Sequence, residues 1–428
     1  MALQSLVIAG RRIELRRIGA TARRAGASLF GYGAAAPALG DEGGVSELRV
    51  ERVVTADHLD ALRTEWNAVA DTMRPRLPFG TWEWATAWWR HFREDRAAVG
   101  DSLHARAVRD ATGELVAVAP LMLTQRPRVG PLRVRTLHFF GADPNITEIR
   151  RMCCRPGREE EVYRAVLADL ERDVQAWDWL VLSGIPESAS AVLAVPGLRW
   201  SREFPDYVLP LPASWDDLRA SLKPNTKRSL RQCYNSLRRD GLSPKRIVVS
   251  APEQMESGLE HLFRLHTALA DQKGASRHPD VFRARRTRSF LVDVCLALAR
   301  RDVTRLFLLE VEGKVVAARV GFVLGEELYL YYSGYDPAYA RYSVMTTMLA
   351  EAIKWAIENH LTLVNLSTGN DASKARWGPR EIVFREAVMV RPRMRARLAH
   401  GAVAVARAAA RSAWIAGVAF RLLGRRAG

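Results

Sequence analysis

Residues 305–323 read RLFLLEVEGKVVAARVGFV, two apolar runs on either side of the turn EGK. Apolar runs that flank a glycine-containing turn predict a β-hairpin. A third apolar run follows at 328–333, residues 344–359 carry apolar side chains at helical spacing, and a last apolar run covers 363–369. This stretch therefore predicts a hairpin, a strand, a helix and a strand, the order of an α/β module.

The same order of elements occurs earlier in the chain. Residues 103–123 have a hairpin pattern around Gly113, and 134–140, 159–174 and 179–184 follow as strand, helix and strand. A repeated order of elements indicates internal duplication. We predict an α/β fold with two copies of one module; the alternative is that two unrelated α/β segments share this order by chance. Helical sequence opens each copy, at 57–71 and 81–92 in the first and at 255–270 and 282–300 in the second.

The length of 428 residues allows two to three domains. We expect a basic flexible lead-in (1–47), an N-terminal module (48–210) and a basic inter-module helix (211–245). A C-terminal module that carries the activity (246–390) and an Arg/Ala-rich helix (391–428) complete the expected organisation.

Charge is concentrated at the two ends of the chain. Of the formal net charge of +17, residues 1–40 contribute +5 through six Arg and one Glu, and residues 391–428 contribute +9 through nine Arg and no acid. Proteins that read nucleic acid carry their basic surface on a folded domain, whereas residues 41–390 are almost neutral here. The distribution therefore predicts no nucleic-acid partner, and the basic run at 223–231 is expected to be a solvated helix face.

Cysteine usage and hydropathy indicate the cellular compartment of the protein. The four cysteines include one adjacent pair, Cys153 and Cys154, and none has a histidine at metal-ligand spacing, which favours a reducing compartment and no structural metal. Residues 1–40 lack the apolar core of a signal peptide, and no run of eighteen apolar residues is free of charge. We expect a cytoplasmic protein without a membrane span.

Three further stretches carry a family resemblance. They are FGTWEW at 79–84, GYDP at 334–337 and LSTGNDASKARWG at 366–378. Together with the duplicated order, they resemble the CelD-like acetyltransferases of bacterial cellulose and exopolysaccharide production, GNAT proteins in the Fem-type double arrangement. The resemblance covers about residues 50–390. It implies two tandem GNAT-like modules, each a mixed, mostly antiparallel sheet flanked by helices, followed by a basic helical C-terminal tail.

The resemblance implies transfer of an acyl group from acetyl-CoA or another acyl-CoA to an amine or hydroxyl, without a metal. The implied acceptor is a sugar or cell-envelope precursor. In GNAT proteins the donor pyrophosphate lies at a helix N-terminus, which Arg341, Tyr342 and Ser343 precede here. The glycine-rich turn typical of that site is missing from the sequence, so an ordinary capped helix is the alternative. Because Fem-type enzymes use aminoacyl-tRNA, the class of donor also stays open.

Five residues are catalytic candidates. The resemblance implies that Lys374 contacts developing negative charge in the acceptor groove. Asp336 or His266 would act as general base, Tyr335 would give a proton to the leaving thiolate, and Asp371 would orient the lysine or act as base. Each also has a structural interpretation, because a loop lysine, an Asp-Pro turn, a packed tyrosine and a helix histidine are common.

Four residues are substrate-binding candidates. Asn370 and Trp377 lie close to the candidate lysine, although asparagine near glycine is also a common turn residue. Trp82 belongs to a run of tryptophans at helical spacing that is mostly core, from which one ring would stack on a sugar. Asp143 holds the place in the first copy that Asp336 holds in the second, as a second binding surface or a retired active site. The resemblance favours a supporting role, because the first copy lacks the Lys-x-x-Trp stretch.

The C-terminal segment predicts a membrane partner. Residues 391–428 place several arginines on one side of an Ala-rich helix, which favours peripheral attachment to the anionic inner face of the plasma membrane. A polysaccharide synthase complex is a further expected partner. Two rival functions remain: Fem-like aminoacyl transfer to a peptidoglycan precursor, the one case that involves tRNA, and a non-catalytic, sugar-binding accessory role. The helical-hairpin arm of many tRNA-using relatives has no counterpart in the sequence of the second module.

Overall fold

The computed structural model is a mixed α/β protein in which sheets are flanked by helices. Its contacts group into two compact units, Met1–Val45 and Ser46–Gly428. In the first unit the structure describes the short strands β1 (Val7–Ile8) and β2 (Arg11–Arg12), and the rest of the expected lead-in lies outside the described residues. The described residues are 7–8, 11–12, 48–131, 133–143, 145–173, 176–187, 189, 195–271, 279–369, 372–406 and 409.

The second unit follows the predicted order of elements in two halves, which we call the N-terminal half (48–210) and the C-terminal half (211–390). The N-terminal half contains β3 (Arg49–Val53), α1 (Ala56–Ala61), α2 (Arg63–Thr72), η1 (Pro78–Gly80), α3 (Trp82–Phe92), β4 (Asp95–Arg96), β5 (Val99–Leu103), β6 (Ala105–Arg109), β7 (Leu115–Ala119), β8 (Leu121–Arg126), β9 (Val134–Phe139), β10 (Cys153–Cys154), α4 (Glu159–Arg172), β11 (Trp179–Ile185) and β12 (Leu198–Pro210). The C-terminal half contains α5 (Trp215–Ser221), α6 (Pro224–Arg239), β13 (Pro244–Val249), α7 (Pro252–Ala270), α8 (Arg285–Ala299), β14 (Thr304–Val311), β15 (Lys314–Leu324), β16 (Glu327–Tyr335), η3 (Pro337–Tyr342), α9 (Val344–Glu358), β17 (Leu363–Thr368), α10 (Ala372–Ala375) and β18 (Arg380–Val390).

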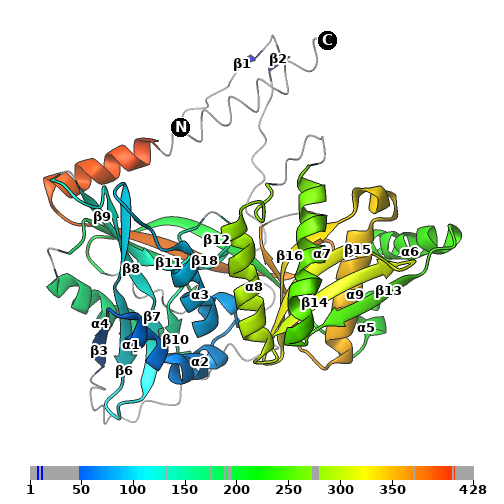
Figure 1. Cartoon of the computed structure of the whole chain (residues 1–428), viewed down its shortest axis with the longest axis horizontal. Helices are drawn as coiled ribbons and strands as arrows, with labels where there is room; N and C mark the ends of the chain where they lie inside the picture. The colour runs from blue at the N-terminus through cyan, green and yellow to red at the C-terminus, as the bar shows by residue number, and fades with distance from the viewer. Residues whose placement is uncertain are drawn as a thin grey trace. The chain divides into compact units, whose positions relative to one another are not determined.

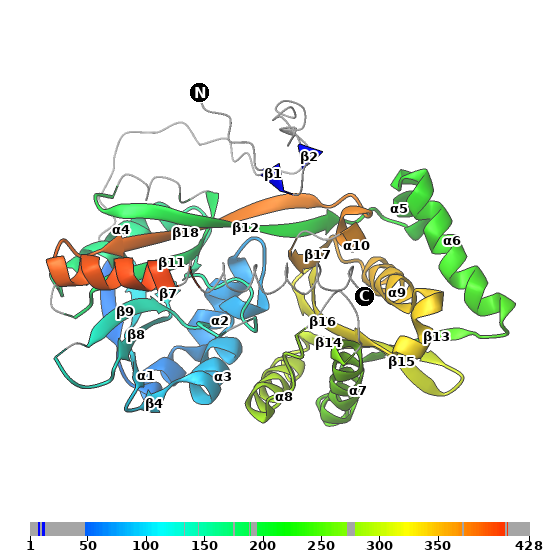
Figure 2. The same cartoon turned by 90° about the horizontal axis from the view of Figure 1, so that it is seen from above.

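The two halves share one sheet. The described strands form a twelve-stranded sheet in the order β13-β14-β15-β16-β17-β12-β18-β11-β9-β8-β5-β4. Its centre is a long antiparallel pair, in which β12 from the N-terminal half runs beside β18 from the C-terminal half, from Leu198↔Met389 to Val208↔Arg380. Figure 2 shows these two strands side by side, crossing between the halves. Because β12 also pairs with β17 and β18 also pairs with β11, each half completes its sheet with a strand of the other.

Helices cover the C-terminal part of this sheet on both faces. In Figure 1 and Figure 2, α7 and α8 lie against one face, and α9 lies against the other. The predicted hairpin at 305–323 is confirmed as β14 and β15, which pair over their whole length. The predicted helix at 344–359 is confirmed as α9, whose buried side chains pack on the sheet.

The corresponding hairpin of the N-terminal half is divided between two sheets. The apolar run 115–123 is interrupted at Pro120, so that β7 lies in a four-stranded sheet, β10-β7-β6-β3, and β8 lies in the twelve-stranded one. Proline has no N–H for the strand ladder and is therefore placed where a strand ends or bends. The run that we predicted as one strand is thus two strands, β7 and β8.

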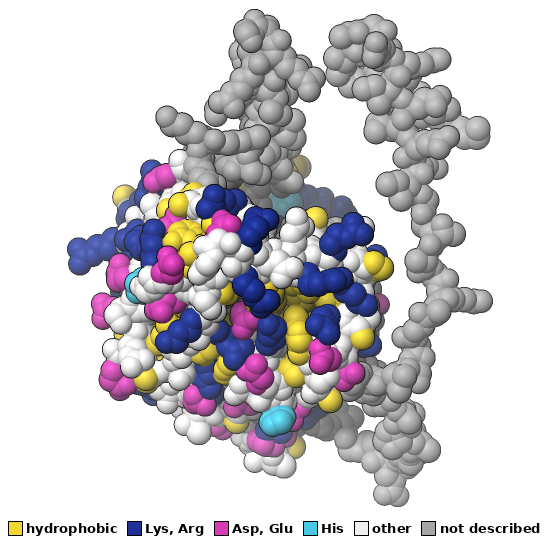
Figure 3. Space-filling view, turned by 90° about the vertical axis from the view of Figure 1, so that its right-hand side faces the viewer, with side chains coloured by type: hydrophobic (Ala, Val, Ile, Leu, Met, Phe, Trp, Pro, Cys, Tyr) yellow, Lys and Arg dark blue, Asp and Glu magenta, His cyan; other side chains and the backbone are white. Residues whose placement is uncertain are grey.

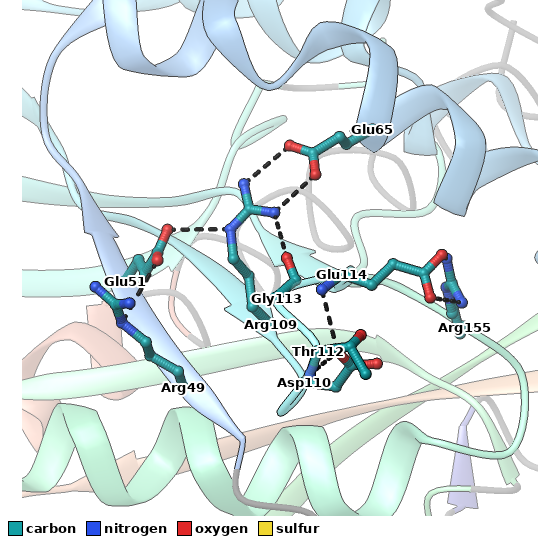
Figure 4. A network of polar contacts seen from close by, with 9 residues as sticks. All are labelled: Arg49, Glu51, Glu65, Arg109, Asp110, Thr112, Gly113, Glu114 and Arg155. Atoms are coloured by element: carbon teal, nitrogen blue, oxygen red, sulfur yellow. Dashed lines mark hydrogen bonds and ion pairs between the residues drawn. The ribbon is translucent and has the colours of Figure 1, made fainter.

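A polar network holds the β6–β7 turn against α2, as Figure 4 shows. The guanidinium of Arg109 donates two hydrogen bonds to the Glu65 carboxylate, at 2.7 and 2.9 Å, and a third to the carbonyl of Gly113 at 3.0 Å. Asp110 accepts from the backbone N–H groups of Thr112 and Glu114 within the turn. The bidentate pair fixes the turn to the helix.

The tryptophan-rich stretch is core. Thr81 caps α3 by accepting from the backbone N–H of Trp84. The ring of Trp84 is buried and meets Phe79 and Tyr331 edge to face, so it packs one half against the other. Trp82 donates from its indole nitrogen to the carbonyl of Leu59 at 3.0 Å and lies outside the cleft described below.

The basic inter-module segment forms α5 and α6, and α6 packs on α9 through its apolar side. Arg228 and Arg231 are exposed on its outer side. The face that carries α5 and α6 is seen in Figure 3, where Lys and Arg side chains are interspersed with Asp and Glu. This distribution is that of a solvated helix face.

Residues 394–406 form a helix at the end of the described chain. His400 faces the body of the protein, where its ring meets that of Trp179 at 5.4 Å between centroids. Met394, Leu398 and Val405 point away from the body and are 77%, 67% and 69% exposed. No helix among the described residues is long and apolar enough to span a bilayer.

Candidate functional site

A cleft opens where two parallel strands separate. β16 and β17 pair in parallel from Glu327↔Leu363 to Tyr329↔Asn365, and among the described residues the pairing ends there. Beyond this point lies a cleft of about 820 Å³, lined by the end of β16, the first turn of α9, the end of β17 and the segment 373–377. Segment 143–150 and the end of β11 also line it, so the N-terminal half supplies one of its walls.

A bulge in β16 shapes the cleft. Arg319 of β15 faces Ser333, whereas Gly321 faces Leu330, so one residue of β15 opposes two residues of β16. An extra residue of this kind bends a strand and redirects its side chains. The bulged residues are Tyr331 and Tyr332, whose rings meet edge to face at 4.6 Å and which both line the cleft.

Tyrosines of β16 hold the wall that the N-terminal half contributes. Tyr331 donates from its hydroxyl to the carbonyl of Ile146 at 2.5 Å, and Tyr332 donates to the carbonyl of Asn145. The hydroxyl of Tyr329 is hydrogen-bonded to the carboxyl of Glu148. Three contacts from one strand thus fix this wall against the C-terminal half.

Two acids with raised pKa values lie at this junction. Burial raises the pKa of Glu148, which lines the cleft, against the opposing effects of the Tyr329 hydrogen bond and the charge of Lys374. Asp206 on β12 is fully buried, and burial raises its pKa to about 7. It accepts a hydrogen bond from Asn365 at 2.7 Å, while its Oδ1 has no partner among the described residues. Burial therefore favours the protonated form of both carboxyls.

Lys374 lies on the cleft wall and closes the end of β17. Its ammonium donates to the carbonyl and hydroxyl of Ser367, at 3.2 and 3.1 Å, and to the carbonyl of Thr368. Ser367 has a φ of 66°, so the strand ends in a left-handed residue that turns its carbonyl toward the lysine. Trp377 also lines the cleft and is buried against Trp215. Asn370 and Asp371 lie outside the described residues.

His266 on α7 reaches the cleft from the opposite side and is 4% exposed. Its Nδ1 lies 3.0 Å from the carbonyl of Ser333. A carbonyl only accepts, so in the neutral ring Nδ1 carries the proton and Nε2 carries the lone pair. Nε2 has no hydrogen-bond partner among the described residues. The position is fixed by Gly334, where a Cβ would lie 2.4 Å from the His266 backbone nitrogen.

Tyr335 is the last residue of β16 and Asp336 follows it, but their side chains lie in different surroundings. Tyr335 lines the cleft, whereas Asp336 does not. Asp336 pairs with Lys314 at 2.7 Å and caps η3 by accepting from the N–H of Ala338 at 3.0 Å. The Lys314 ammonium holds the pKa of Asp336 below its ordinary value. A carboxylate stabilised in this way is a poor proton acceptor, which favours the structural interpretation of Asp336.

The residues expected at the donor pyrophosphate lie outside the cleft. Tyr342 donates from its hydroxyl to Asp240 at 2.7 Å, and Arg341 pairs with the same carboxylate at 3.4 Å. Ser343 adopts a left-handed φ of 54° and makes no side-chain cap on α9. The first turn of α9 presents Met345 and Thr346 to the cleft instead.

Asp143 lines the cleft at its N-terminal wall. Its carboxylate accepts from the backbone N–H groups of Ile146 and Thr147, at 2.7 and 3.1 Å, and from the indole of Trp88 at 2.6 Å. These contacts fix the turn that carries Glu148 into the cleft. The position of Asp143 is that of a supporting residue for this wall.

Sequence reasoning missed Glu148, Arg150, Asp206, Arg319 and Arg376, although the cleft or the acids beneath it include them. Arg376 lies within the stretch 366–378 but was not chosen as a candidate, no motif surrounds the other four, and Glu148 and Asp206 belong to the half that was expected to be inactive. The described residues contain no group of three or more His, Cys, Asp or Glu side chains placed to hold a metal ion.

Comparisons with known proteins agree with this architecture. Residues 224–375 match the family profile described as an acetyltransferase (GNAT) domain. The crystal structure of FemX is similar over 79% of this chain and 97% of that chain, with 12% identity and a TM-score of 0.53. A tandem GNAT protein from the clavulanic acid biosynthesis pathway matches over 80% and 98% of the two chains, with 13% identity and a TM-score of 0.42. L-PGS from Bacillus licheniformis matches over 74% and 93%, with 11% identity and a TM-score of 0.42.

No curated protein sequence matches this chain significantly. The likeness to FemX, at this level of identity, concerns the fold. GNAT domains use acyl-CoA, and the cleft described above lies in large part within the matched residues. The C-terminal half therefore contains a segment that matches a GNAT acetyltransferase domain, and the chain shares its fold with FemX over 79% of its length.

Proposed function

We propose that the cleft binds an acyl-CoA, with acetyl-CoA as the simplest donor, and transfers its acyl group to an amine or hydroxyl of a sugar or cell-envelope precursor. The observation that carries this proposal is the separation of β16 from β17 beside the β16 bulge, within the residues that match the GNAT domain. The opening is lined by His266, Tyr335 and Lys374. A base, a proton donor and a cation thus converge on one cavity.

The chemistry assigned to these residues is direct transfer. The acceptor nitrogen or oxygen attacks the thioester carbonyl and forms the new C–N or C–O bond, while its proton passes to Nε2 of His266. The C–S bond then breaks, and the hydroxyl of Tyr335 protonates the departing thiolate. Both side chains exchange their protons with water afterwards. His266 suits the role of base because its lone pair is unpartnered and its ring is held by Ser333.

Lys374 is assigned to positioning and charge. Its ammonium is already bonded to the carbonyls at the end of β17, so the side chain is held in one place. A fixed cation at the cleft wall stabilises negative charge on the reacting carbonyl or on an acceptor phosphate without reorganising. Burial raises the pKa of Glu148 on the opposite wall, which favours its neutral form over a competing negative charge.

Acetyl-CoA binding measured by calorimetry tests the proposal, followed by thiol release with amino sugars and cello-oligosaccharides. Thr346→Trp in the first turn of α9 fills the cleft and is expected to abolish acetyl-CoA binding. Gln232→Trp, on the exposed side of α6, is the matched control and should bind normally. A wild-type protein that fails to bind acetyl-CoA would refute the assignment of the donor.

Two rivals give different results in the same assays. A Fem-like aminoacyl transferase acting on a peptidoglycan precursor would transfer from aminoacyl-tRNA and ignore acetyl-CoA. A non-catalytic, sugar-binding accessory of a polysaccharide synthase would release no thiol with any acceptor. The CelD-like assignment to exopolysaccharide production predicts turnover with a sugar.

The proposal includes peripheral attachment to the anionic inner face of the plasma membrane, for a protein that works in the cytoplasm. Helix 394–406 presents Met394, Leu398 and Val405 outward, with Arg395 exposed on the same helix. An apolar stripe beside cations suits the boundary between head groups and acyl chains. In this arrangement apolar side chains enter the bilayer and arginines meet the head groups.

Flotation with anionic phosphatidylglycerol vesicles tests the attachment. Met394→Glu with Leu398→Glu should leave the protein in the unbound fraction. Val54→Glu with Val129→Glu changes two other exposed apolar residues and is the matched control. Equal loss of flotation in both variants, or no flotation of the wild type at low salt, would contradict the attachment.

A further inference from the structure

We propose that a groove beneath helix 394–406 is a second binding site, and that it holds the anionic saccharide extension of the acceptor whose reactive group lies in the catalytic cleft. The inference rests on the proposed function, because it names the acceptor class of that cleft. The groove measures about 1690 Å³. Its floor is one face of β9, β11 and β18, and residues 397–403 form a wall. The opposite face of the same strands packs on α4.

The groove is rich in arginine. Among the described residues that line it, six are arginines and three are acids. One of those acids, Glu386, faces two guanidiniums, Arg202 at 3.2 Å and Arg150 at 3.9 Å. Because the arginines outnumber the acids by three, the described lining of the groove carries a net positive charge. The arginines are Arg126, Arg150, Arg199, Arg202, Arg391 and Arg397.

Arg391 supports an anionic ligand independently. Its side chain is nine-tenths buried, stacks on Trp177 at 3.8 Å and donates to the carbonyl of Leu170 at 3.0 Å. Its Nε has no hydrogen-bond partner among the described residues. The carboxylates of Glu171 and Asp173 act on its charge without forming an ion pair with it among the described contacts. A buried guanidinium without a direct ion pair is costly. An anion in the groove would supply that ion pair.

The remaining lining fits a saccharide. Trp200 is 39% exposed at the groove, and Val181 and Val388 give the floor an apolar surface between the arginines. Flat aromatic and apolar surfaces suit the C–H face of a sugar ring, while the guanidinium fork matches carboxylate or phosphate. The combination selects a sugar chain that carries acidic groups over a neutral one.

The groove and the catalytic cleft are neighbours that share part of their lining. Asp143, Arg150 and Arg202 line both cavities. A chain with its reactive group near Lys374 can therefore continue past Arg150 and Arg202 into the groove. This continuity makes the groove an acceptor subsite of the same enzyme.

Binding to the full-length protein tests the inference, with tryptophan fluorescence or calorimetry as the readout. The probes are hexagalacturonate for carboxylate, inorganic pyrophosphate for phosphate and cellohexaose as the neutral chain. At least one anionic probe is expected to bind, more weakly as ionic strength rises, and cellohexaose at least tenfold more weakly. The anion that binds better identifies the acidic group. Failure of both anions, or cellohexaose binding as tightly as hexagalacturonate, would overturn the proposal.

Variants locate the site. The side chains of Arg199 and Arg397 are exposed and make no hydrogen bond or ion pair with the described residues, so their replacement should leave packing intact. Arg199→Ala with Arg397→Ala should weaken the anionic probe at least tenfold, while Arg228→Ala with Arg231→Ala on α6 should stay within twofold. Unchanged binding in the first pair would refute the groove. Acetyl-CoA binding, measured in parallel, should be normal in both pairs; its absence from the wild type would contradict the proposed function separately from this site.

Discussion

The two halves contain the same strand pair with different surroundings. β9 and β11 in the N-terminal half, like β16 and β17 in the C-terminal half, pair in parallel over three residue pairs. At the end of β11, a Cβ on Gly184 would lie 2.4 Å from the carbonyl oxygen of Arg150. At the end of β17, the nearest atom to a Cβ on Gly369 is Nζ of Lys374, at 3.9 Å. Backbone fills the first opening, whereas the second leads into the cleft.

The strands before these openings differ as well. β16 carries the bulge that brings Tyr331 and Tyr332 to the cleft, whereas β9 pairs with β8 without a register shift over its described length. One order of elements therefore yields a cavity only where a bulge bends the strand and the neighbouring segment stays out of the gap. The N-terminal half uses its own segment, 143–150, to build the wall of the other half's cleft.

The largest effect is expected from replacing His266. The experiment tests whether the C-terminal half is the catalytic one, because His266 belongs to that half. His266→Asn keeps an N–H donor for the carbonyl of Ser333 but lacks the lone pair of Nε2. We expect kcat to fall by about 10²–10⁴-fold, the usual contribution of a general base. Thiol release measures it, with circular dichroism as a check on folding.

His91→Asn is the matched control in the N-terminal half, where His91 pairs with Asp293 outside the cleft. It should change kcat less than twofold. Equal activity of His266→Asn and the wild type would remove His266 from the mechanism.

Substitutions of Gly184 and Gly369 test directly whether the openings at the ends of β11 and β17 differ. Gly184→Ala must displace the backbone at Arg150, so we expect it to lower the free energy of unfolding by about 3 kcal/mol. Gly369→Ala faces open space and carries only the strain of its positive φ, about 1 kcal/mol. Urea unfolding compares them, and equal losses would show that the openings do not differ.

Lys374→Met tests whether the charge of Lys374 contributes to catalysis in addition to its hydrogen bonds at the end of β17. We expect kcat/KM to fall by about 10–100-fold, since a fixed charge at the reacting group is lost. The loss of contacts to Ser367 and Thr368 should lower stability by about 1 kcal/mol. Lys354→Met removes a lysine of α9 that pairs with Glu351 away from the cleft, and should keep full activity. Full activity of Lys374→Met would contradict our assignment.

The smallest effects concern two buried acids on the crossing strands. The pKa of Asp206 on β12 is raised to about 7 by burial, so the folded protein keeps a proton that the unfolded chain releases near pH 3.8. Its effect on stability is therefore present at low pH and is lost as the pH rises toward 7. Asp206→Asn should be more stable than the wild type at pH 8, by on the order of 1–2 kcal/mol, and about equal at pH 4.

For Glu386 on β18 the pKa is lowered instead of raised, so the pH dependence of its effect on stability is opposite to that of Asp206. Burial acts to raise the pKa of Glu386, but hydrogen bonds from Ser183 and Ser201 and the charge of Arg202 lower it overall. Its stabilising effect is present at neutral pH and fades in acid, so Glu386→Gln should lose stability at pH 7 and less at pH 4. Urea unfolding at several pH values measures both variants, and parallel pH profiles for the two would refute the assignment.

Much of the fold could be predicted from the sequence, and less of the site. The helix at 344–359 and the hairpin at 305–323 were visible because their apolar periodicity is local. His266, Tyr335 and Lys374, chosen as candidates, do lie together on the cleft. Arg341 and Tyr342 do not, because their partner Asp240 lies at the end of α6, a contact that no local pattern encodes.

The sequence by itself determined two α/β copies, their order of elements and the half that carries the Lys-x-x-Trp stretch, because apolar periodicity and turn residues act within a few positions. Only the tertiary structure decided that β12 and β18 cross between the halves and that the charge of Lys374 acts on Glu148 and Asp206. These residues lie more than 150 positions apart in the sequence, and burial in the folded protein, which no local pattern reports, raises the pKa of both acids.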